Sequence, residues 1–285
     1  MQSVVIKDLM GIVADERRRE RHPMYLRTVL KEYLQVFILN FIYTHPRYSK
    51  KIIFTGGTCL RHLYDLPRLS EDLDFDVIGE IKIEELAVEL EKYWLKWMPE
   101  AEVKVSVRQR GMQLLHRFYL LDKLELTGPN DSPVLYVKSD ISPMTSKIYG
   151  TEASLQSRHG FSYLVTHYDL STLMTSKIHA VLYRERFEGR ENREIVKGRD
   201  FFDLLWFLDK KVEPNMERFG DLLGRKASNK EMWEMVTERV KWALSLSASF
   251  ERDLYPFIDN QAVIKGYIEN YLISYNEKKK YLNKN

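Results

Sequence analysis

The stretch Gly56-Gly57-Thr58, followed after a short spacer by Asp72-Leu73-Asp74, decides the fold that this sequence predicts. Residues 51–54 read Lys-Ile-Ile-Phe and favour a short buried strand, and the two glycines after it permit a tight turn where the main chain approaches a ligand. Thr58 then begins a predicted helix. Because main-chain N–H groups at a helix start attract phosphate, this turn indicates a phosphate site.

A second predicted strand, over residues 69–77, carries three acids on one face. Asp72, Asp74 and Asp76 alternate with apolar residues that would face the core. Such a face needs water or a cation, and carboxylate oxygens suit Mg²⁺, which also keeps waters and substrate phosphates as ligands. A glycine turn alone, or an acid pair alone, is usually an ordinary turn or a solvated strand face. The two together, in the order strand, turn, helix, acidic strand, favour nucleotidyl transfer.

A third carboxylate is predicted on a neighbouring strand. Residues 134–141 are rich in β-forming residues and include Asp140 near their end. In a two-metal site, Asp140 would bind the metal nearest the attacking hydroxyl and accept or organise its proton, while Asp72 and Asp74 would bridge both ions and the phosphates. The alternative is a surface aspartate at the end of a strand.

Three separated motifs resemble the DNA polymerase β-like nucleotidyltransferases, and within them the AbiEii-type (MenT-like) toxins. The first is the glycine turn with residues 68–74, Arg-Leu-Ser-Glu-Asp-Leu-Asp, which is similar to an R-x-S-x-D-x-D signature. The second is residues 138–141, Lys-Ser-Asp-Ile, similar to a K-x-D-I strand. The third runs from Lys177 through Arg184 to residues 199–204, similar to a helical K-x-x-A…R…R-D-x-x-D-L motif.

The expected fold is α+β, a nucleotidyltransferase-like mixed sheet flanked by helices with a mostly helical C-terminal part. We expect a nucleotidyltransferase core with N-terminal helices over residues 1–165, and a helical domain over residues 166–285 that completes the active-site cleft. The candidate catalytic residues are Asp72, Asp74, Asp140, Lys177 and Asp200, of which the first three are the candidate metal ligands. The candidates for nucleotide binding are Gly56, Gly57, Thr58, Arg68, Ser70, Lys177 and Arg199.

The C-terminal part also indicates an anionic ligand from its charges. Residues 177–199 hold seven Lys or Arg against four Glu, an excess that can neutralise a triphosphate or a stretch of RNA backbone. Residues 169–171 read as the start of a helix that would carry Lys177, Arg184 and Arg186. A solvated, charged helix is the alternative, and we favour it for Arg186, Arg190 and Arg193. Asp200 is expected to pair with Lys177 or Arg199, and such a pair can be purely structural.

Ser70 permits two interpretations. One is a turn hydroxyl that bonds nearby main chain. The other is regulation, because a phosphate on Ser70 would place about −1.5 to −2 charge beside the metal-binding carboxylates and compete for the metal.

The composition is that of an ordinary soluble protein with one or two domains. Of the 285 residues, 44% are hydrophobic and 30% charged, and the net charge of +3 is too small to establish nucleic-acid binding. The one cysteine, Cys59, excludes an intramolecular disulfide, and the seven histidines lack zinc-site spacing. We see no targeting segment and no membrane span, and expect a cytoplasmic protein without membrane contact.

These observations predict an enzyme that uses Mg²⁺ and a nucleoside triphosphate (NTP) to add nucleotides to an acceptor hydroxyl. The resemblance implies a toxin of a toxin–antitoxin or abortive-infection system, with a cognate antitoxin as partner and an RNA acceptor, the 3′ end of tRNA, so that translation is inhibited. Two alternatives remain open. One is a transferase that adenylylates a small molecule or a protein side chain, and the other is a non-catalytic module that binds RNA or a partner.

Overall fold

The computed structural model describes residues 3–128, 130–188 and 193–281. The chain forms two compact units: unit 1 comprises Met1–Met144 and Ala153–His167, and unit 2 comprises Thr145–Glu152 and Tyr168–Asn285. Arg190 and the side chain of Arg193, which we interpreted as solvated charges, lie outside the described residues. The assignment of residues 1–165 and 166–285 to a catalytic core and a cleft-completing domain stays a prediction.

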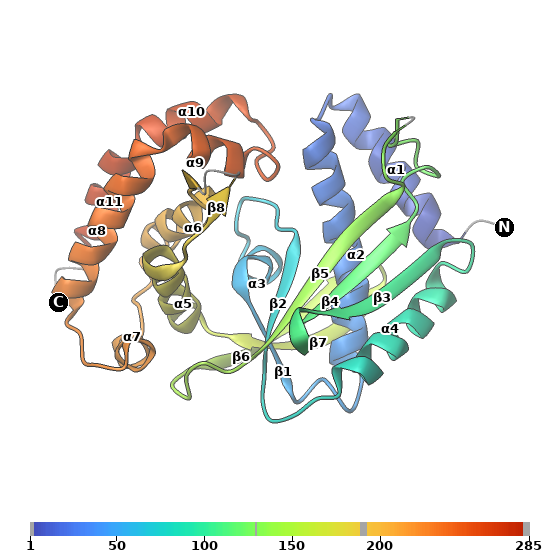
Figure 1. The fold of residues 1–285 in the computed structure, drawn as a ribbon, viewed down its shortest axis with the longest axis horizontal. Helices are drawn as coiled ribbons and strands as arrows, with labels where there is room; N and C mark the ends of the chain where they lie inside the picture. The colour runs from blue at the N-terminus through green and yellow to red at the C-terminus, as the bar shows by residue number, and fades with distance from the viewer. Residues whose placement is uncertain (1–2, 129, 189–192, 282–285) are drawn as a thin grey trace. The chain divides into compact units, whose positions relative to one another are not determined.

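A mixed sheet forms the centre of unit 1 (Figure 1). Within the described chain it has seven strands in the order β3-β4-β5-β2-β1-β7-β6. β2 runs parallel to β5 and β1 parallel to β7, whereas β1–β2, β3–β4 and β4–β5 are antiparallel. The strands are β1 (Ile52–Thr55), β2 (Asp72–Val77), β3 (Glu102–Arg108), β4 (Gln113–Tyr119), β5 (Val134–Pro143), β6 (Thr151–Arg158) and β7 (Phe161–Tyr168).

Two long helices, α2 (Pro23–Thr44) and α4 (Ile83–Trp97), cover one face of this sheet (Figure 1). Trp94 of α4 packs edge-on against Phe118 of β4, with 4.8 Å between ring centroids, and Phe37 of α2 lies 5.6 Å from Trp94. Because side chains alternate along a strand, this face takes the buried apolar residues of β2 and leaves its acids on the other face. α1 (Val4–Arg18) packs on α2, and α3 (Gly56–Leu63) packs on β1 and β2.

The predicted acidic strand is confirmed, with a later start. Along β2, half-buried aspartates alternate with buried apolar residues, as predicted. The strand begins at Asp72 and not at Leu69, because side chains donate hydrogen bonds to the main-chain carbonyls of the residues before Asp72. Arg68 donates to the carbonyl of Leu69 at 2.8 Å, and Gln35 donates to that of Ser70 at 3.1 Å. The helix after the glycines begins at Gly56, two residues earlier than predicted.

Unit 2 is mostly helical, as predicted. Its helices are α5 (Leu170–Tyr183), α6 (Gly198–Asp209), α7 (Met216–Leu223), α8 (Asn229–Ser245), α9 (Ser247–Leu254), α10 (Ala262–Glu269) and α11 (Tyr271–Lys279). The carboxylate of Asp169 caps α5 by accepting from the N–H of Thr172 at 2.8 Å. Two antiparallel strands of two residues each, β8 (Phe187–Glu188) and β9 (Arg193–Glu194), were not predicted.

One helix prediction in unit 2 was wrong at its C-terminal end. α5 stops at Tyr183, so Arg184 and Arg186 follow the helix instead of lying on it. Asn270 separates α10 from α11, and its side-chain amide donates to the carbonyl of Gly266 at 2.8 Å. The main-chain N–H of Asn270 donates to the same carbonyl at 3.1 Å, so both donors of Asn270 meet the end of α10.

The expected α+β fold class is therefore confirmed: a mixed sheet flanked by helices and a mostly helical C-terminal part. Within the part of the chain that the structure describes, every helix is too short or too polar to cross a bilayer.

Replacing Gly198 with alanine should destabilise unit 2. A Cβ at Gly198 would lie 2.6 Å from the main-chain oxygen of Phe250, which cannot move aside as a flexible side chain can. We expect a loss of about 1–3 kcal/mol in the free energy of unfolding, measured by urea denaturation. The matched control is Gly266→Ala in α10, where a Cβ meets nothing within 4 Å. That variant should be neutral or more stable by up to about 1 kcal/mol, and equal losses in both would contradict the steric account.

Candidate active site

The glycine turn allows a carboxylate to approach the main chain. Gly56 has φ +77°, in the left-handed region, and a Cβ there would lie 2.6 Å from Cγ of Asp74. Glycine alone therefore satisfies both the backbone conformation and the close approach. The approach follows from the antiparallel register of β1 and β2, which places Asp74 opposite Thr55, the residue before the turn.

A buried hydroxyl pair supports the entry to β2. The hydroxyl of Thr58 lies within hydrogen-bonding distance of the Ser70 hydroxyl, at 2.8 Å, and of the carbonyl of Asp72. Arg68 is also buried, and a Cβ on Gly57 would lie 2.7 Å from its Nη2 atom. The turn-hydroxyl interpretation of Ser70 agrees with these contacts, while its phosphorylation stays a prediction.

Asp140 lies beside the acids of β2. In the parallel pairing of β2 and β5, Asp74 is opposite Asp140, so both side chains leave the same face of the sheet. Gln113 of β4 is opposite Asp140 on the other side and donates to its Oδ1 at 2.7 Å. The sequence analysis missed Gln113, because this contact depends on strand pairing across 27 residues of chain.

The donor chemistry of this face fits a hard divalent cation. Asp72, Asp74 and Asp140 offer carboxylate oxygens from two neighbouring strands, the type of ligand that Mg²⁺ prefers. Across the residues that the structure describes, however, no three His, Cys, Asp or Glu side chains are grouped so as to hold a metal ion. The metal-ligand assignment therefore stays a prediction.

In unit 2, Lys177 of α5 bridges two buried carboxylates of α6. Its Nζ lies 2.7 Å from Oδ1 of Asp200 and 2.8 Å from Oδ2 of Asp203. Arg184 reaches the other oxygen of Asp200 at 2.7 Å. Of the two pairs predicted for Asp200, the one with Lys177 is thus present, whereas Arg199 pairs with Asp253 at 3.3 Å.

The charges around Asp200 shift its titration. Burial would raise the pKa of Asp200, but Lys177, Arg184 and Lys197 outweigh burial and hold the pKa well below its usual range. Asp200 is therefore an ionised partner of cations and not a proton donor near neutral pH. Burial lowers the pKa of Lys197 to about 8, against an opposing effect of Asp200.

The structure thus brings the predicted site residues together in two groups, one in each unit. The group in unit 1 consists of Gly56, Gly57, Thr58, Arg68, Ser70, Asp72, Asp74 and Asp140. In unit 2, Lys177 and Asp200 are in direct contact, and Arg199 is the residue next to Asp200 in α6.

Comparisons with solved structures identify the fold. The structure resembles the crystal structure of JHP933 from Helicobacter pylori, with a TM-score of 0.51 and 17% identity over 90% of this chain and 94% of that one. It also resembles a proposed nucleotidyltransferase from H. pylori, with a TM-score of 0.50 and 17% identity over 90% of this chain and 96% of that one. At this identity the likeness concerns the fold alone.

Residues 40–254 match the model of a family described as nucleotidyl transferase AbiEii toxins of type IV toxin–antitoxin systems. The match covers well over half of the chain, and the chain belongs to this AbiEii nucleotidyltransferase family. No curated protein matches it in sequence. The resemblance inferred from the three motifs is confirmed, and with it the broad class of a toxin nucleotidyltransferase.

Gly56→Ala should remove nucleotidyl transfer while leaving most of the fold intact. The new Cβ must displace the Asp74 carboxylate, and a shift of about 1 Å at a reacting centre can cost about 100-fold in rate. The left-handed backbone adds about 1–2 kcal/mol of instability. We would measure the rate of nucleotidyl transfer and, in parallel, the thermal unfolding of the variant. Gly11→Ala in α1 is the control, because a Cβ there meets nothing within 4 Å. Native turnover in Gly56→Ala would contradict the proposed approach of Asp74.

Lys177→Met should destabilise unit 2 by about 3–5 kcal/mol, because it removes the ammonium that pairs with both Asp200 and Asp203. Urea denaturation measures the loss, and exposed Lys226→Met is the matched control. The depressed pKa of Asp200 stabilises the native state above the usual aspartate pKa of 3.8, and this contribution is lost as pH falls below it. Asp200→Asn should therefore make the free energy of unfolding depend less on pH in the acid range below 3.8. An unchanged stability in Lys177→Met would show that the ion cluster contributes little.

Proposed function

We propose that this protein is a Mg²⁺-dependent nucleotidyltransferase that transfers a nucleotide from an NTP to the 3′ end of tRNA. An acceptor hydroxyl attacks the α-phosphate, the bond to the β-phosphate oxygen breaks, and pyrophosphate leaves. The observation that carries this proposal is the register that sets Asp74 beside Asp140, next to the glycine turn at the start of α3. Membership of the AbiEii family supports the same reaction.

Asp72, Asp74 and Asp140 would hold the divalent cation. When bound there, it would neutralise charge on the phosphate oxygens. Asp140 would accept the proton of the acceptor hydroxyl, and Gln113 would hold one oxygen of Asp140 in place for this purpose. The N–H groups of Gly57 and Thr58, in the first turn of α3, would bind phosphate oxygens.

The likeness of residues 177–204 to the family motif supports placing the second group of residues in the same reaction. We assign Lys177 to nucleotide binding, with Asp200 keeping its ammonium charged and oriented. In this proposal the helical C-terminal part completes the active site, and Arg199 is a supporting residue held by Asp253.

The biological setting follows from the family. Type IV toxin–antitoxin membership implies a cognate antitoxin that restrains the activity. Added nucleotides at the 3′ end of tRNA would block aminoacylation and so inhibit translation. Because tRNA and NTPs are both cytoplasmic, we assign the activity to the cytoplasm.

Incubation with total tRNA, Mg²⁺ and each labelled NTP in turn should transfer label to tRNA. Asp72→Asn and Asp74→Asn should each lower the rate by about 100-fold or more, because loss of a metal ligand removes several kcal/mol of transition-state stabilisation. Asp76→Asn is the matched control: it lies on the same face of β2, further from the start of α3, and should keep nearly native activity.

The outcomes separate the candidate functions. Label on protein or on a small-molecule acceptor would favour the alternative transferase. No label with any NTP, together with RNA binding, would favour a non-catalytic module. Equal losses of activity in the variants of Asp72, Asp74 and Asp76 would contradict the assignment of the metal site to Asp72 and Asp74.

A further inference from the structure

The sheet face that carries the candidate metal ligands of unit 1 continues across β5, β4 and β3. Residues that are opposite each other on neighbouring strands leave the same side of a sheet, and Asp140 is opposite both Asp74 and Gln113. The other side of these strands takes the buried apolar residues that pack under α2 and α4. The more exposed positions of β3, β4 and β5 therefore lie on the same face as Asp140.

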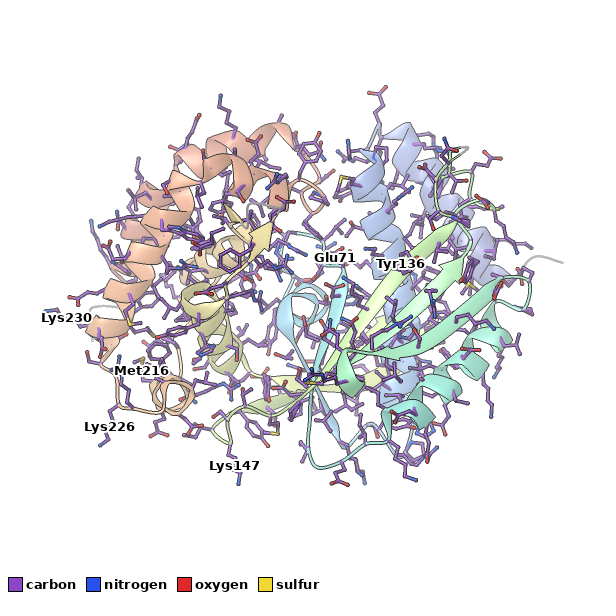
Figure 2. All side chains as sticks on the ribbon, in the orientation of Figure 1. Glu71, Tyr136, Lys147, Met216, Lys226 and Lys230 are labelled. Carbon is purple, nitrogen blue, oxygen red and sulfur yellow. The ribbon has the colours of Figure 1, made fainter. Side chains whose placement is uncertain are left out.

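Four cations and an aromatic ring occupy this part of the face. Tyr136 of β5 is opposite Arg117 of β4, which in turn is opposite Lys104 of β3. Tyr136, which Figure 2 labels on β5, is 42% exposed. One further cation on β5 and another on β3 share the same side of the sheet. The cationic face, as we call it, consists of Lys104, Arg108, Arg117, Tyr136 and Lys138.

Most of the positive charge on the cationic face is not neutralised by neighbouring carboxylates. Within the described part of the chain, Arg108, Arg117 and Lys138 make no ion pair, and the Nε of Arg117 is buried without a hydrogen-bond partner. Lys104 has two carboxylates nearby, each at 3.9 Å, which is long for an ion pair. Cations left in excess on one face attract a ligand with several negative charges.

The strand order places the cationic face on the side from which an acceptor would approach. β2, which carries Asp72 and Asp74, lies between β1 and β5. The glycine turn follows β1, whereas Asp140 and the cationic face lie on the β5 side. Attacking and leaving oxygens are roughly in line in phosphoryl transfer. If pyrophosphate leaves toward the glycine turn, the attacking hydroxyl has to come from the β5 side.

The cationic face is also within reach of the nucleotides next to that hydroxyl. Along β5, Lys138 is two residues from Asp140 and Tyr136 is four, or about 7 and 13 Å at about 3.3 Å per residue. Arg108 is two strands away from Asp140, or about 10 Å. Stacked nucleotides of one strand advance about 3.4 Å each, so these distances correspond to roughly the last two to four nucleotides.

The residue types of the cationic face suit a single strand of nucleic acid. Such strands are bound where cations contact the phosphates and an exposed ring stacks on a base. A duplex keeps its bases stacked inside and cannot use the ring of Tyr136 in this way. An acidic protein segment could use the charges, but the position beside Asp140 favours the strand that carries the attacking hydroxyl.

We propose that the cationic face binds the unpaired 3′ strand of the acceptor RNA. Arg108, Arg117 and Lys104 contact phosphate oxygens, and Tyr136 stacks on a base. Lys138 belongs to a family motif, whereas these four residues lie outside all three motifs. The inference rests on the proposed function for the identity of the acceptor.

The test measures RNA binding by fluorescence anisotropy across a range of salt concentrations. The probes are an RNA hairpin with four unpaired nucleotides at its 3′ end and the same hairpin with a blunt end. The first test variant is Arg108→Gln with Arg117→Gln. Because Arg117 is partly buried, a second variant, Lys104→Gln with Arg108→Gln, changes only exposed side chains. Thermal unfolding verifies that each variant is folded.

The matched control, Lys92→Gln with Lys96→Gln, removes the same charge from the same unit. Both lysines are exposed on α4, the helix that covers the opposite face of the sheet. The control therefore changes the net charge of the protein by as much as either test variant does, but leaves the cationic face intact.

Each test variant should bind the hairpin with the unpaired end at least about tenfold more weakly than the native protein. The slope of log K against log salt should become shallower by about 1.4, which corresponds to two phosphate contacts on a single strand. Tyr136→Leu should weaken binding about fivefold or more without changing this slope, because stacking is not ionic. The control variant should show less than about a twofold effect, as should the blunt hairpin with every variant.

The KM for NTP should stay within about twofold in both test variants, because the proposed triphosphate site lies on the β1 side of β2. Native RNA affinity in folded test variants would overturn the proposal, as would equal weakening by the control or equal weakening of the blunt hairpin. If the test variants keep their RNA affinity but lose affinity for an oligo-glutamate peptide, the cationic face takes an acidic protein segment instead.

Failure of the proposed function is distinguishable from failure of this inference. If the native protein binds the unpaired strand through the cationic face but transfers no nucleotide, the enzyme proposal fails and the RNA-binding face stands. If it transfers nucleotides to RNA and the test variants bind normally, the binding face alone fails. A native protein that binds neither hairpin overturns the binding face.

Discussion

The absence of a side chain at Gly56 is the constraint on which the site in unit 1 depends. Its positive φ turns the chain from β1 directly into α3, and the space that a Cβ would fill is taken by the Asp74 carboxylate. Any other residue would have to move that carboxylate or change the turn. The parallel pairing of β2 with β5 then fixes Asp140 beside Asp74, and Gln113 fixes one oxygen of Asp140. A short glycine turn and two strand registers thus determine how three carboxylates are presented.

Unit 2 uses charge in a different way. In unit 1 the acids share one half-buried sheet face, where a cation would be favourable. In unit 2 the carboxylates of Asp200 and Asp203 are buried and already neutralised by Lys177 and Arg184. This internal pairing leaves the surrounding cations in excess, so unit 2 favours an anionic ligand where the acidic face of unit 1 favours a cationic one. The proposed transfer of a nucleotide to RNA would use both preferences.

Much of this arrangement could be predicted from sequence where the signal is local. The alternation of acids and apolar residues along β2 gave both the strand and its acidic face, and Asp169 marked the start of α5. The three motifs gave the family, which the match over residues 40–254 confirms. The pairing of Lys177 with Asp200 was predicted as one of two choices.

What could not be predicted depends on contacts between distant parts of the chain. Gln113 reaches Asp140 only through the register of β4 and β5. β2 starts later than predicted because the side chain of Gln35, in α2, donates to the carbonyl of Ser70.

The most direct test of the central claim is binding of Mn²⁺, as a spectroscopic substitute for Mg²⁺, measured by electron paramagnetic resonance in the presence of a non-hydrolysable NTP analogue. The account predicts that the native protein and Asp76→Asn bind Mn²⁺ together with the analogue, and that Asp74→Asn and Asp140→Asn do not. Undiminished Mn²⁺ binding in folded Asp74→Asn and Asp140→Asn would contradict the claim that these carboxylates form the metal site of a nucleotidyltransferase.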